Sequence, residues 1–469
     1  MLIRNLCAVG AIAFSFFLIP WRSSLGQTPK SAADMSDADI RGILNDQLDP
    51  KVDLGIIAGL IHAGSTRVVS AGKAGPGGAP ALDGNTVFEI GSATKVFTAT
   101  LLAEMIGRGE VHLDDPVAKY LPATVRVPTR NNKQITLLDL VTHTSGLPRL
   151  PTNLQPKDPD NPYADYTVEQ MYAFLSGYEL TRDIGAQFEY SNLGAGLLGH
   201  VLSLRAGMSY EALVTKRILE PLQMKDTVIT LRPDLRSRLA PGHDSAGSLV
   251  ANWDLPTLAG AGALRSTMND MLKFLGANLA GTGPLAAVLR PTHESRRSLG
   301  TPDGSIGLGW LLRRGFGAEI VWHNGGTGGY HSFIGFDPRT GDGVVVLHNS
   351  AASIDDIGFH LINSQFPISK PAAPPKARKE FAINPSLLAA YVGEYQLAPT
   401  FTMTVTREGD QLFIQATGQS KLPVFPESET DFFYKIVDAQ VTFVKDKDGT
   451  VTGLVLHQGG RDTPGMKIK

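Results

Sequence analysis

The stretch "FEIGSATKVFTATLLAEM", residues 88 to 105, decides how this sequence is interpreted. Ser92 follows a glycine and a strand-like run, so we expect it at the N-terminus of a helix, where serine is a common cap. Lys95 lies three residues later, on the same face of that helix. The residues that follow are apolar nearly all round, which is typical of a buried helix. A lysine at the head of such a helix is costly unless it has a chemical role.

The pair Ser92 and Lys95 predicts an activated nucleophile. A serine hydroxyl is a weak nucleophile until a base takes its proton. Lysine is a poor base at its reference pKa of ~10.4, but burial disfavours its charged form. Ser-Lys pairs are a known alternative to the Ser-His-Asp triad. The competing interpretation is an ordinary helix cap followed by a surface lysine.

Two further stretches contain candidate site residues. The run "EYSNLGAGLLGH" places Tyr190 and Asn192 two residues apart, just before another helical pattern. They are either a proton-relaying phenol and a substrate-gripping amide, or a buried tyrosine and a helix cap. The run "VWHNGGTGGYHSF" places His323 at the end of an apolar strand. The glycines after it indicate either a hairpin turn or a bare backbone that lies against a substrate.

The order of apolar patterns predicts an α+β fold, with an antiparallel sheet flanked by helices and a large helical insert. Strand patterns lie near both ends of residues 33–367, and helical patterns lie between them. The predicted helices cover 95–107, 136–142, 167–177, 192–205, 209–220 and 266–280. Residues 368–380 are rich in Pro, Ala and basic residues, which predicts a linker. Residues 381–469 alternate apolar and polar positions, which predicts a small β-barrel-like domain after a short helix at 385–391.

The first 26 residues have the pattern of an export signal. Arg4 precedes the apolar run "LCAVGAIAFSFFLIP", and small residues follow before position 26. The rival interpretation is an uncleaved anchor, but the apolar run is shorter than the ~20 residues that a spanning helix needs. We therefore expect a periplasmic or secreted protein without a stable membrane anchor. The single cysteine, Cys7, lies inside this segment.

Composition excludes several classes of function. The formal net charge is −2 over 469 residues, so nothing indicates a nucleic-acid partner. The sequence contains no H-E-x-x-H and no C-x-x-C, so we expect no metal site.

The order S-x-x-K, Y-x-N, H-x-G identifies a family. The motifs "GSATK", "YSN" and "HNG", with the flanks "ITLLDLVTHTSGLP" and "GTGGYHSFIGFDP", resemble the serine β-lactamase and penicillin-binding-protein superfamily. The match is similar to class C β-lactamases and to the related D-alanyl-D-alanine carboxypeptidases and esterases. It covers roughly residues 52 to 349.

The resemblance implies a role for each motif residue. Ser92 would attack a carbonyl and become acylated, and Lys95 and Tyr190 would share the general-base and general-acid work. Asn192 would hold the amide side chain of the substrate. The backbone N–H groups of Ser92 and Gly326 would form the oxyanion hole. The resemblance also implies that no metal or organic cofactor takes part and that the partner is a small-molecule or peptide substrate.

The third motif departs from the usual β-lactamase pattern, which is K-T-G. Here it is His323-Asn324-Gly325, which the resemblance also places in substrate binding. A histidine with a reference pKa near ~6.5 would offer only part of a positive charge at neutral pH. We therefore expect carboxylate substrates to bind more weakly as pH rises through the titration of His323.

Several activities fit these motifs. The first is β-lactam hydrolysis, and the alternatives are a D-alanyl-D-alanine carboxypeptidase/endopeptidase and a carboxylesterase. A receptor of another class would be acylated by penicillin without turning it over. The presence of all of Ser92, Lys95, Tyr190 and Asn192 favours an enzyme, because a receptor has no chemical need for the full set.

Overall fold

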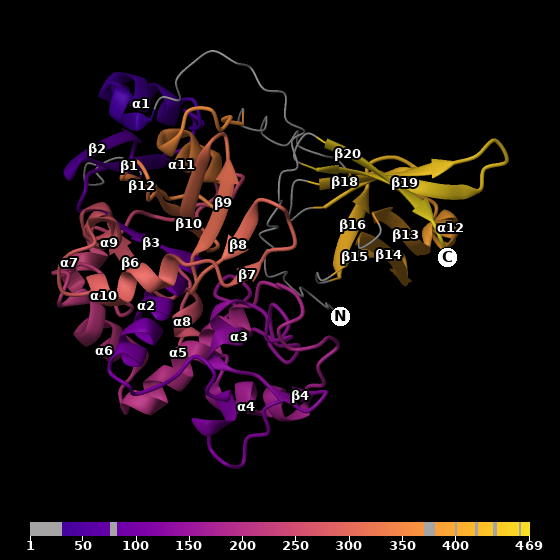
Figure 1. The fold of residues 1–469 in the computed structure, drawn as a ribbon. Coiled ribbons are helices and arrows are strands. Elements are labelled where there is room, and N and C mark those ends of the chain that lie inside the picture. The colour runs from indigo at the N-terminus through magenta and orange to yellow at the C-terminus, as the bar shows by residue number, and fades with distance from the viewer. Residues whose placement is uncertain are drawn as a thin grey trace. The chain divides into compact units, whose positions relative to one another are not determined.

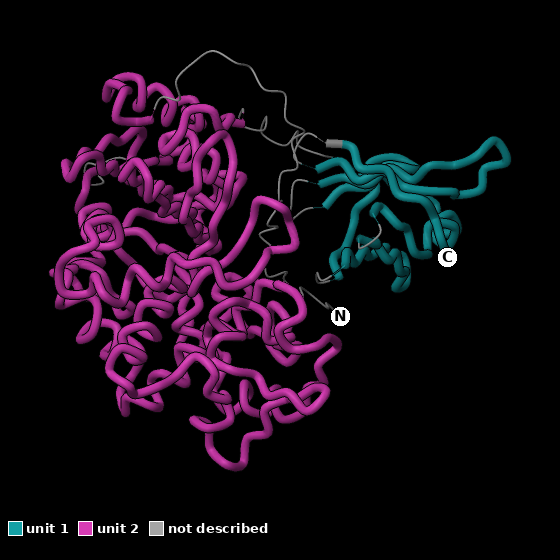
Figure 2. The backbone as a smooth tube through the Cα atoms, viewed as in Figure 1, with its two compact units in different colours: residues 1–21, 371–469 teal, residues 22–370 magenta. Residues whose placement is uncertain are grey.

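The computed structural model describes residues 31–75, 82–369, 380–398, 401–417, 421–434, 439–458 and 461–469. The described residues up to 369 form one compact unit, and those from 380 onward form a second (Figure 2). We call them the larger unit and the barrel unit. The predicted signal segment 1–26 and most of the predicted linker 368–380 lie outside the described residues, so both stay predictions.

The larger unit is built on an antiparallel sheet that combines strands from both ends of the unit (Figure 1). Among the described residues, eight strands pair in the order β2-β1-β12-β11-β10-β9-β8-β7. Their bounds are β1 (Gly55–His62), β2 (Ser65–Gly72), β7 (Arg297–Ser298), β8 (Gly304–Ile306), β9 (Leu311–Gly315), β10 (Ala318–Gly326), β11 (His331–Asp337) and β12 (Asp342–His348). The early strand β1 pairs with the late strand β12, with Ile57 opposite Leu347. This pairing confirms the predicted sheet.

Most of the remaining elements belong to the helical insert. The helices are α1 (Asp37–Asn45), α2 (Thr94–Gly107), α3 (Leu137–Val141), α4 (Val168–Gly177), α5 (Asn192–Ala206), α6 (Tyr210–Val214), α7 (Pro233–Arg236), α8 (Ala259–Gly262), α9 (Met268–Ala280), α10 (Ala286–Leu289) and α11 (Asp355–Ile362). Short turns are η1 (Ala32–Asp34), η2 (Gly91–Ala93), η3 (Val117–Lys119), η4 (Thr215–Leu219) and η5 (Arg290–His293). Two small sheets pair β3 (Val87–Glu89) with β6 (Arg265–Thr267), and β4 (Thr129–Arg130) with β5 (Lys133–Gln134). Within the described parts of the chain, no helix has the length and apolar character to cross a bilayer.

Helices cover both faces of the large sheet. A β-carbon on Gly59 of β1 would meet the sulfur of Met268, so α9 lies directly against one face. A β-carbon on Gly358 of α11 would meet the ring of Phe333 in β11. Because side chains alternate along a strand, the register places Phe333 on the face opposite Gly59. Burial on both faces explains why β1 reads as an unbroken apolar run.

The structure differs from the sequence prediction at two helices. The helix predicted from residue 266 begins at Met268, because the residues just before it form β6 and pair with β3. Thr267 ends that strand and caps α9, since its hydroxyl accepts the N–H of Asp270. The helix predicted over 209–220 continues from α6 into a π-helical turn at η4.

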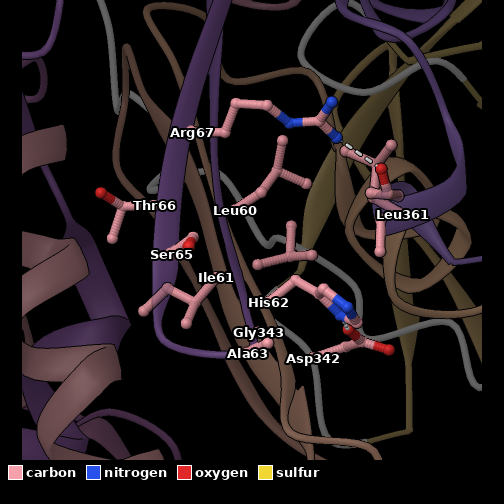
Figure 3. A pocket seen from close by; sticks show the side chains of 13 residues that line it. Leu60, Ile61, His62, Ala63, Ser65, Thr66, Arg67, Asp342, Gly343 and Leu361 are labelled. Carbon is pink, nitrogen blue, oxygen red and sulfur yellow. Dashed lines mark hydrogen bonds and ion pairs between the residues drawn. The ribbon is translucent and has the colours of Figure 1, made fainter.

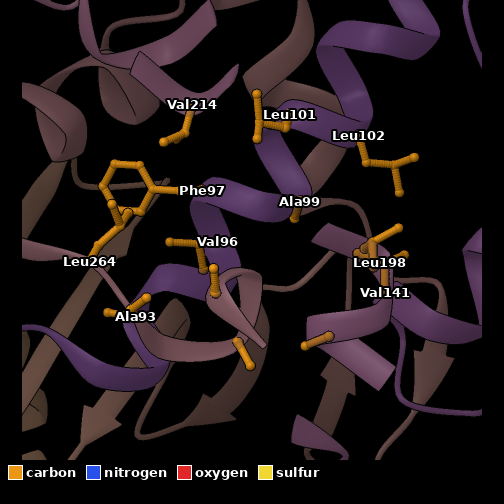
Figure 4. Close-up of a cluster of buried hydrophobic side chains, with 14 of the residues drawn as sticks. Ala93, Val96, Phe97, Ala99, Leu101, Leu102, Val141, Leu198, Val214 and Leu264 are labelled. Carbon is orange, nitrogen blue, oxygen red and sulfur yellow. The ribbon is translucent and has the colours of Figure 1, made fainter. Parts of the chain in front are cut away.

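Helix α2 is surrounded by buried apolar side chains of neighbouring segments (Figure 4). All of its residues from Thr94 to Met105 are buried, which confirms the prediction of a buried helix. Phe97 stacks on Phe274 of α9, with 4.0 Å between the ring centroids. Burial of each large apolar side chain contributes ~1.5–3 kcal/mol, so this core fixes the position of the residues at the start of α2.

The barrel unit is a closed antiparallel barrel, which confirms the predicted β-barrel-like domain. A turn and a helix, η6 (Pro385–Leu387) and α12 (Leu388–Tyr391), precede it where the short helix was predicted. The strands are β13 (Gly393–Ala398), β14 (Phe401–Glu408), β15 (Gln411–Ala416), β16 (Leu422–Pro426), β17 (Asp431–Phe433), β18 (Ala439–Lys445), β19 (Val451–Gln458) and β20 (Arg461–Lys467). Closure comes from pairing of β13 with β20, with Tyr395 opposite Lys467. Tyr391 and Phe443 stack inside it, with ring centroids 4.4 Å apart.

Candidate active site

Ser92 lies in the short turn η2, which joins β3 to α2. The residue before it, Gly91, has a φ of 48°, a left-handed conformation that favours glycine. A β-carbon on Gly91 would lie only 2.7 Å from the backbone nitrogen of Gly326. Glycine at this position therefore permits both the turn and its close contact with β10. Ser92 itself is partly exposed.

Lys95 lies in the first turn of α2, and its side chain is buried. Its Nζ is 2.9 Å from Oγ of Ser92. It is also 2.9 Å from Oδ1 of Asn192 and 2.7 Å from the carbonyl oxygen of Ala261. Three elements, α2, α5 and α8, therefore meet at this amine.

The surroundings of Lys95 favour its neutral form. Burial, and after it the positive charge of Arg149, lower the pKa of Lys95 well below its usual value. A neutral amine has two N–H groups and one lone pair. The amide oxygen of Asn192 and the carbonyl oxygen of Ala261 can only accept hydrogen bonds, so they take the two N–H groups. The lone pair then faces the hydroxyl of Ser92, which is the arrangement that a general base needs.

Tyr190 and Asn192 join the same cluster. The Nζ of Lys95 lies 4.7 Å from the centroid of the Tyr190 ring. Burial raises the pKa of Tyr190, and a hydrogen bond with Ser92 offsets part of that rise. Tyr190 is therefore a neutral phenol near neutral pH. The cap of α5 is Ser191, whose hydroxyl accepts the N–H of Gly194 at 2.8 Å, so the side chain of Asn192 is available to Lys95.

Two residues from the "HTSGLPR" segment surround the phenol. The ring of His143 lies 4.6 Å from the ring of Tyr190, and its Nδ1 accepts the N–H of Ser191 at 3.1 Å. Burial lowers the pKa of His143 well below its usual value, which is consistent with an accepting nitrogen. The guanidinium carbon of Arg149 lies 5.2 Å from the same tyrosine ring. His143 therefore helps to fix the position of Tyr190, and Arg149 lies beside the same ring.

The residues of the third motif point to two different faces of β10. A β-carbon on Gly325 would lie 1.9 Å from the carbonyl oxygen of Ile90, so this side of the strand faces η2. Asn324 points to the other face, where its Nδ2 donates to Oδ2 of Asp355 at 2.6 Å. Alternation along the strand places His323 on the side of Gly325. The structure therefore does not bring the Asn324 side chain, predicted to bind substrate, to Ser92.

The prediction that His323 carries part of a positive charge near neutral pH is wrong. His323 has no exposed surface, and its Nδ1 lies 2.5 Å from the carbonyl oxygen of Asn324. Burial is the main cause that lowers the pKa of His323 to about 3, and the electrostatic interaction with Lys95 is the second. The imidazole is neutral at every pH above that value, so it provides no cation for a substrate near neutral pH. The predicted weakening of binding through its titration does not follow.

The N–H of Gly326 in β10 points away from the neighbouring strand β11. The N–H of Thr327 donates to the carbonyl of Tyr330 at 3.0 Å, on the side of β11. Successive N–H groups of a strand point to opposite edges, so the N–H of Gly326 points away from β11 and toward Gly91. The β9–β10 ladder ends at Trp322, before this position.

Several groups around the site are not indicated by the sequence motifs. The carbonyl of Ala261 carries no side-chain signal, because any residue has a carbonyl there. Asp355 bridges two strands by accepting from Asn324 and facing Nε2 of His331 at 2.9 Å. Arg149 follows the "HTSG" segment in the sequence, and this position is the sequence feature that indicates a place near the site.

A cavity of about 270 Å³ lies away from this cluster, against the β1–β2 hairpin and β12 (Figure 3). At its edge Nδ1 of His62 lies 2.6 Å from Oδ1 of Asp342. The guanidinium of Arg67 is held by the carbonyl of Met35, at 2.9 Å. Ser92 does not line this cavity, so it is not part of the candidate active site.

The fold and the Ser-Lys-Tyr cluster define a serine hydrolase of the β-lactamase type. A model of the family described as Beta-lactamase matches residues 44–363, so the chain belongs to this family, as the motifs predicted. A second family model, described as "Domain of unknown function (DUF3471)", matches residues 377–467, which contain the barrel strands.

Individual relatives agree with this assignment. The D-alanyl-D-alanine-carboxypeptidase/endopeptidase AmpH of Escherichia coli (strain K12) is 32% identical over 301 residues, covering 61% of this chain and 76% of the relative. A β-lactamase of Pseudomonas fluorescens is 29% identical over 352 residues, covering 66% and 94%. The solved β-lactamase/D-alanine carboxypeptidase of Yersinia pestis, complexed with citrate, superposes with a TM-score of 0.59 at 26% identity. That alignment covers 67% of this chain and 93% of the solved one.

Proposed function

We propose that this chain forms an acyl-enzyme on Ser92 and hydrolyses β-lactams or related amides such as D-alanyl-D-alanine peptides. One observation carries the proposal: a buried amine, on Lys95, lies 2.9 Å from the serine hydroxyl and is held by two oxygens that can only accept. That arrangement favours an unprotonated amine with its lone pair directed at the hydroxyl, because protonation would add a charge at a buried site.

Acylation follows from this geometry. As Oγ of Ser92 bonds to the substrate carbonyl carbon, its proton passes to Nζ of Lys95. The carbonyl oxygen becomes an oxyanion, which accepts hydrogen bonds from the N–H groups of Ser92 and Gly326. Collapse of this intermediate breaks the C–N bond. The leaving nitrogen takes the proton back from Lys95, directly or through the phenol of Tyr190.

Deacylation reverses the proton movements with water in place of the leaving amine. Water gives a proton to the base formed by Lys95 and Tyr190 while its oxygen bonds to the acyl carbon. The Ser92–acyl bond then breaks, Oγ regains a proton, and a carboxylic acid leaves. The high pKa of the buried Tyr190 makes Lys95 the better resting base and the phenol the better relay.

A D-alanyl-D-alanine peptidase is the second candidate, and two observations favour it. The relative AmpH is named for carboxypeptidase and endopeptidase activity. The family position that is usually lysine in β-lactamases holds His323, whose pKa of about 3 leaves it uncharged. Both candidates share the acylation step on Ser92 and differ in leaving group.

A three-substrate assay tests the proposal. The mature protein, beginning after residue 26, is incubated with a chromogenic cephalosporin, a D-Ala-D-Ala peptide and a short-chain nitrophenyl ester. Turnover of the cephalosporin or the peptide identifies the reaction, and the ester alone would indicate the carboxylesterase alternative. Ser92→Ala should abolish turnover, whereas the exposed Ser65→Ala should retain it. Full activity in Ser92→Ala would refute the mechanism, and a stable adduct without turnover would support a receptor.

We also propose export, because the N-terminal segment has the order of a signal peptide. Cleavage near Gly26 would place the enzyme in the periplasm or outside the cell. N-terminal sequencing of the protein purified from its natural host tests this directly. A mature chain that still begins at Met1 would contradict the proposal.

A further inference from the structure

Arg149 has a fixed place beside the catalytic cluster. Its backbone carbonyl accepts the N–H groups of Asn192 and Leu193, at 3.0 and 3.2 Å, which ties it to the first turn of α5. Its guanidinium carbon lies 5.2 Å from the ring centroid of Tyr190, and the residue is only partly buried. The side chain therefore lies beside the Tyr190 ring, and its backbone is tied to Asn192, the residue that would hold the acyl part of a substrate.

Among the residues that the structure describes, no aspartate or glutamate forms an ion pair with Arg149. Arg182, by contrast, pairs with Glu189 and donates to the carbonyl of Leu147, two residues before Arg149. Unpaired guanidinium groups that border a site are ready to receive an anion, since they form two parallel hydrogen bonds with a carboxylate.

The guanidinium of Arg149 is always charged, unlike three other groups of this cluster. Lys95, His143 and His323 all have pKa values lowered by burial, which favours their neutral forms. The charge of Arg149 contributes to that lowering for Lys95 and His143, as expected for groups that lie close together. A substrate anion entering this region would therefore meet Arg149.

We propose that Arg149 binds a carboxylate carried by the acyl part of the substrate and so selects acyl donors with an anionic group next to the amide that Asn192 holds. The inference rests on the proposed function, because it requires Ser92 to be acylated. It goes further by assigning a specificity residue and a substrate class.

The test measures acylation, because acylation is common to a hydrolase and to a slow receptor. Benzylpenicillin and carbenicillin differ by one carboxylate on the carbon next to the side-chain amide. Mass spectrometry gives the second-order rate constant for acylation of Ser92 by each. In Arg149→Gln the carbenicillin-to-benzylpenicillin ratio should fall roughly 10- to 100-fold, the range for loss of a charge-assisted hydrogen bond. Arg149→Lys, which keeps the charge, should restore much of the ratio.

The control is Arg182→Gln, which removes a nearby guanidinium that already has a carboxylate partner, and its ratio should match the wild type. Equal slowing of both penicillins in Arg149→Gln would overturn the proposal, since it would indicate a structural role. So would a ratio that does not change. If Arg149→Gln does not fold, Arg149→Met and Arg149→Lys provide the same comparison.

A second pair of probes separates the two ends of the substrate. A D-Ala-D-Ala peptide and its C-terminal amide differ only in the leaving group. A loss in Arg149→Gln confined to the free acid would overturn the acyl-side assignment. Absence of any acylation of wild-type Ser92 would instead be a failure of the proposed function, which is a distinct result.

Discussion

Replacement of Lys95 by methionine tests whether the buried amine is neutral in the folded protein. In the unfolded chain a lysine has a pKa near ~10.4, whereas burial lowers the pKa of Lys95 well below that when the chain folds. Between the two values the unfolded chain binds more protons than the folded one. The free energy of unfolding therefore rises with pH in this window, by up to ~1.36 kcal/mol for each pH unit.

The magnitude can be worked out from the structure. Each pH unit within this window raises the Lys95 contribution to the free energy of unfolding by up to about 1.36 kcal/mol, so a two-unit interval such as pH 7 to 9 changes it by up to about 2.7 kcal/mol. Methionine has similar length and does not titrate, so Lys95→Met should lack this slope. The substitution also leaves the oxygens of Asn192 and Ala261 without a donor, at ~1–3 kcal/mol each, but that cost does not vary with pH in this range.

Urea unfolding followed by tryptophan fluorescence provides the assay. Trp253, Trp310 and Trp322 all lie in the larger unit, and residues 381–469 contain no tryptophan, so the signal reports the unit that contains the site. The difference between wild type and Lys95→Met should grow in favour of wild type from pH 7 to 9. The exposed Lys216→Met serves as a control and should follow the wild-type slope. A difference that stays constant over this range would refute the neutral-amine argument.

Three further predictions concern the rest of the site and the domain boundary. Gly91→Ala places a β-carbon against the backbone nitrogen of Gly326, which is one donor of the predicted oxyanion hole. The value of kcat/KM should fall ~10²- to 10³-fold, because that is the effect of losing one such donor. A kcat/KM within a factor of three of the wild type would count against the predicted hole. Because the pKa of His323 is about 3, this histidine should not change the KM for carboxylate substrates between pH 5.5 and 8. The pH profiles of KM for the wild type and for His323→Gln should therefore have the same shape. An inflection that is present in the wild type and absent from His323→Gln would show that the histidine titrates in this range. A chain truncated at Pro375 should remain folded and active towards the same substrates, since the catalytic cluster lies wholly within the larger unit; complete insolubility would show that the barrel unit is needed for folding.

Much of the site was accessible from sequence because its side chains lie in short local patterns. The three-residue spacing of Ser92 and Lys95 fixes their proximity on one helical turn, whatever else the fold does. The apolar character of the following residues indicated burial, and with it the altered chemistry of the amine. The pairing of early with late strands also follows from the order of the elements, because strand patterns lie near both ends of this part of the chain and helical patterns lie between them.

The remaining features depend on contacts between residues far apart in the chain. Lys95 and the carbonyl of Ala261 are 166 residues apart, and a backbone oxygen has no signature in a sequence. The charge state of His323 is set by how completely other elements bury it, which the motif alone does not determine. The helix predicted over 266–280 overlaps the end of strand β6, because pairing of β6 with β3 overrides the local helical propensity there.

The most direct test of the account is to locate the covalent bond. Mature protein is incubated with benzylpenicillin, digested, and mapped by mass spectrometry, in parallel with Ser92→Ala and Lys95→Met. We predict a single adduct on Ser92, absent from Ser92→Ala and formed far more slowly in Lys95→Met. Modification of another residue, or equally fast labelling without the amine of Lys95, would contradict the claim that this amine activates this hydroxyl.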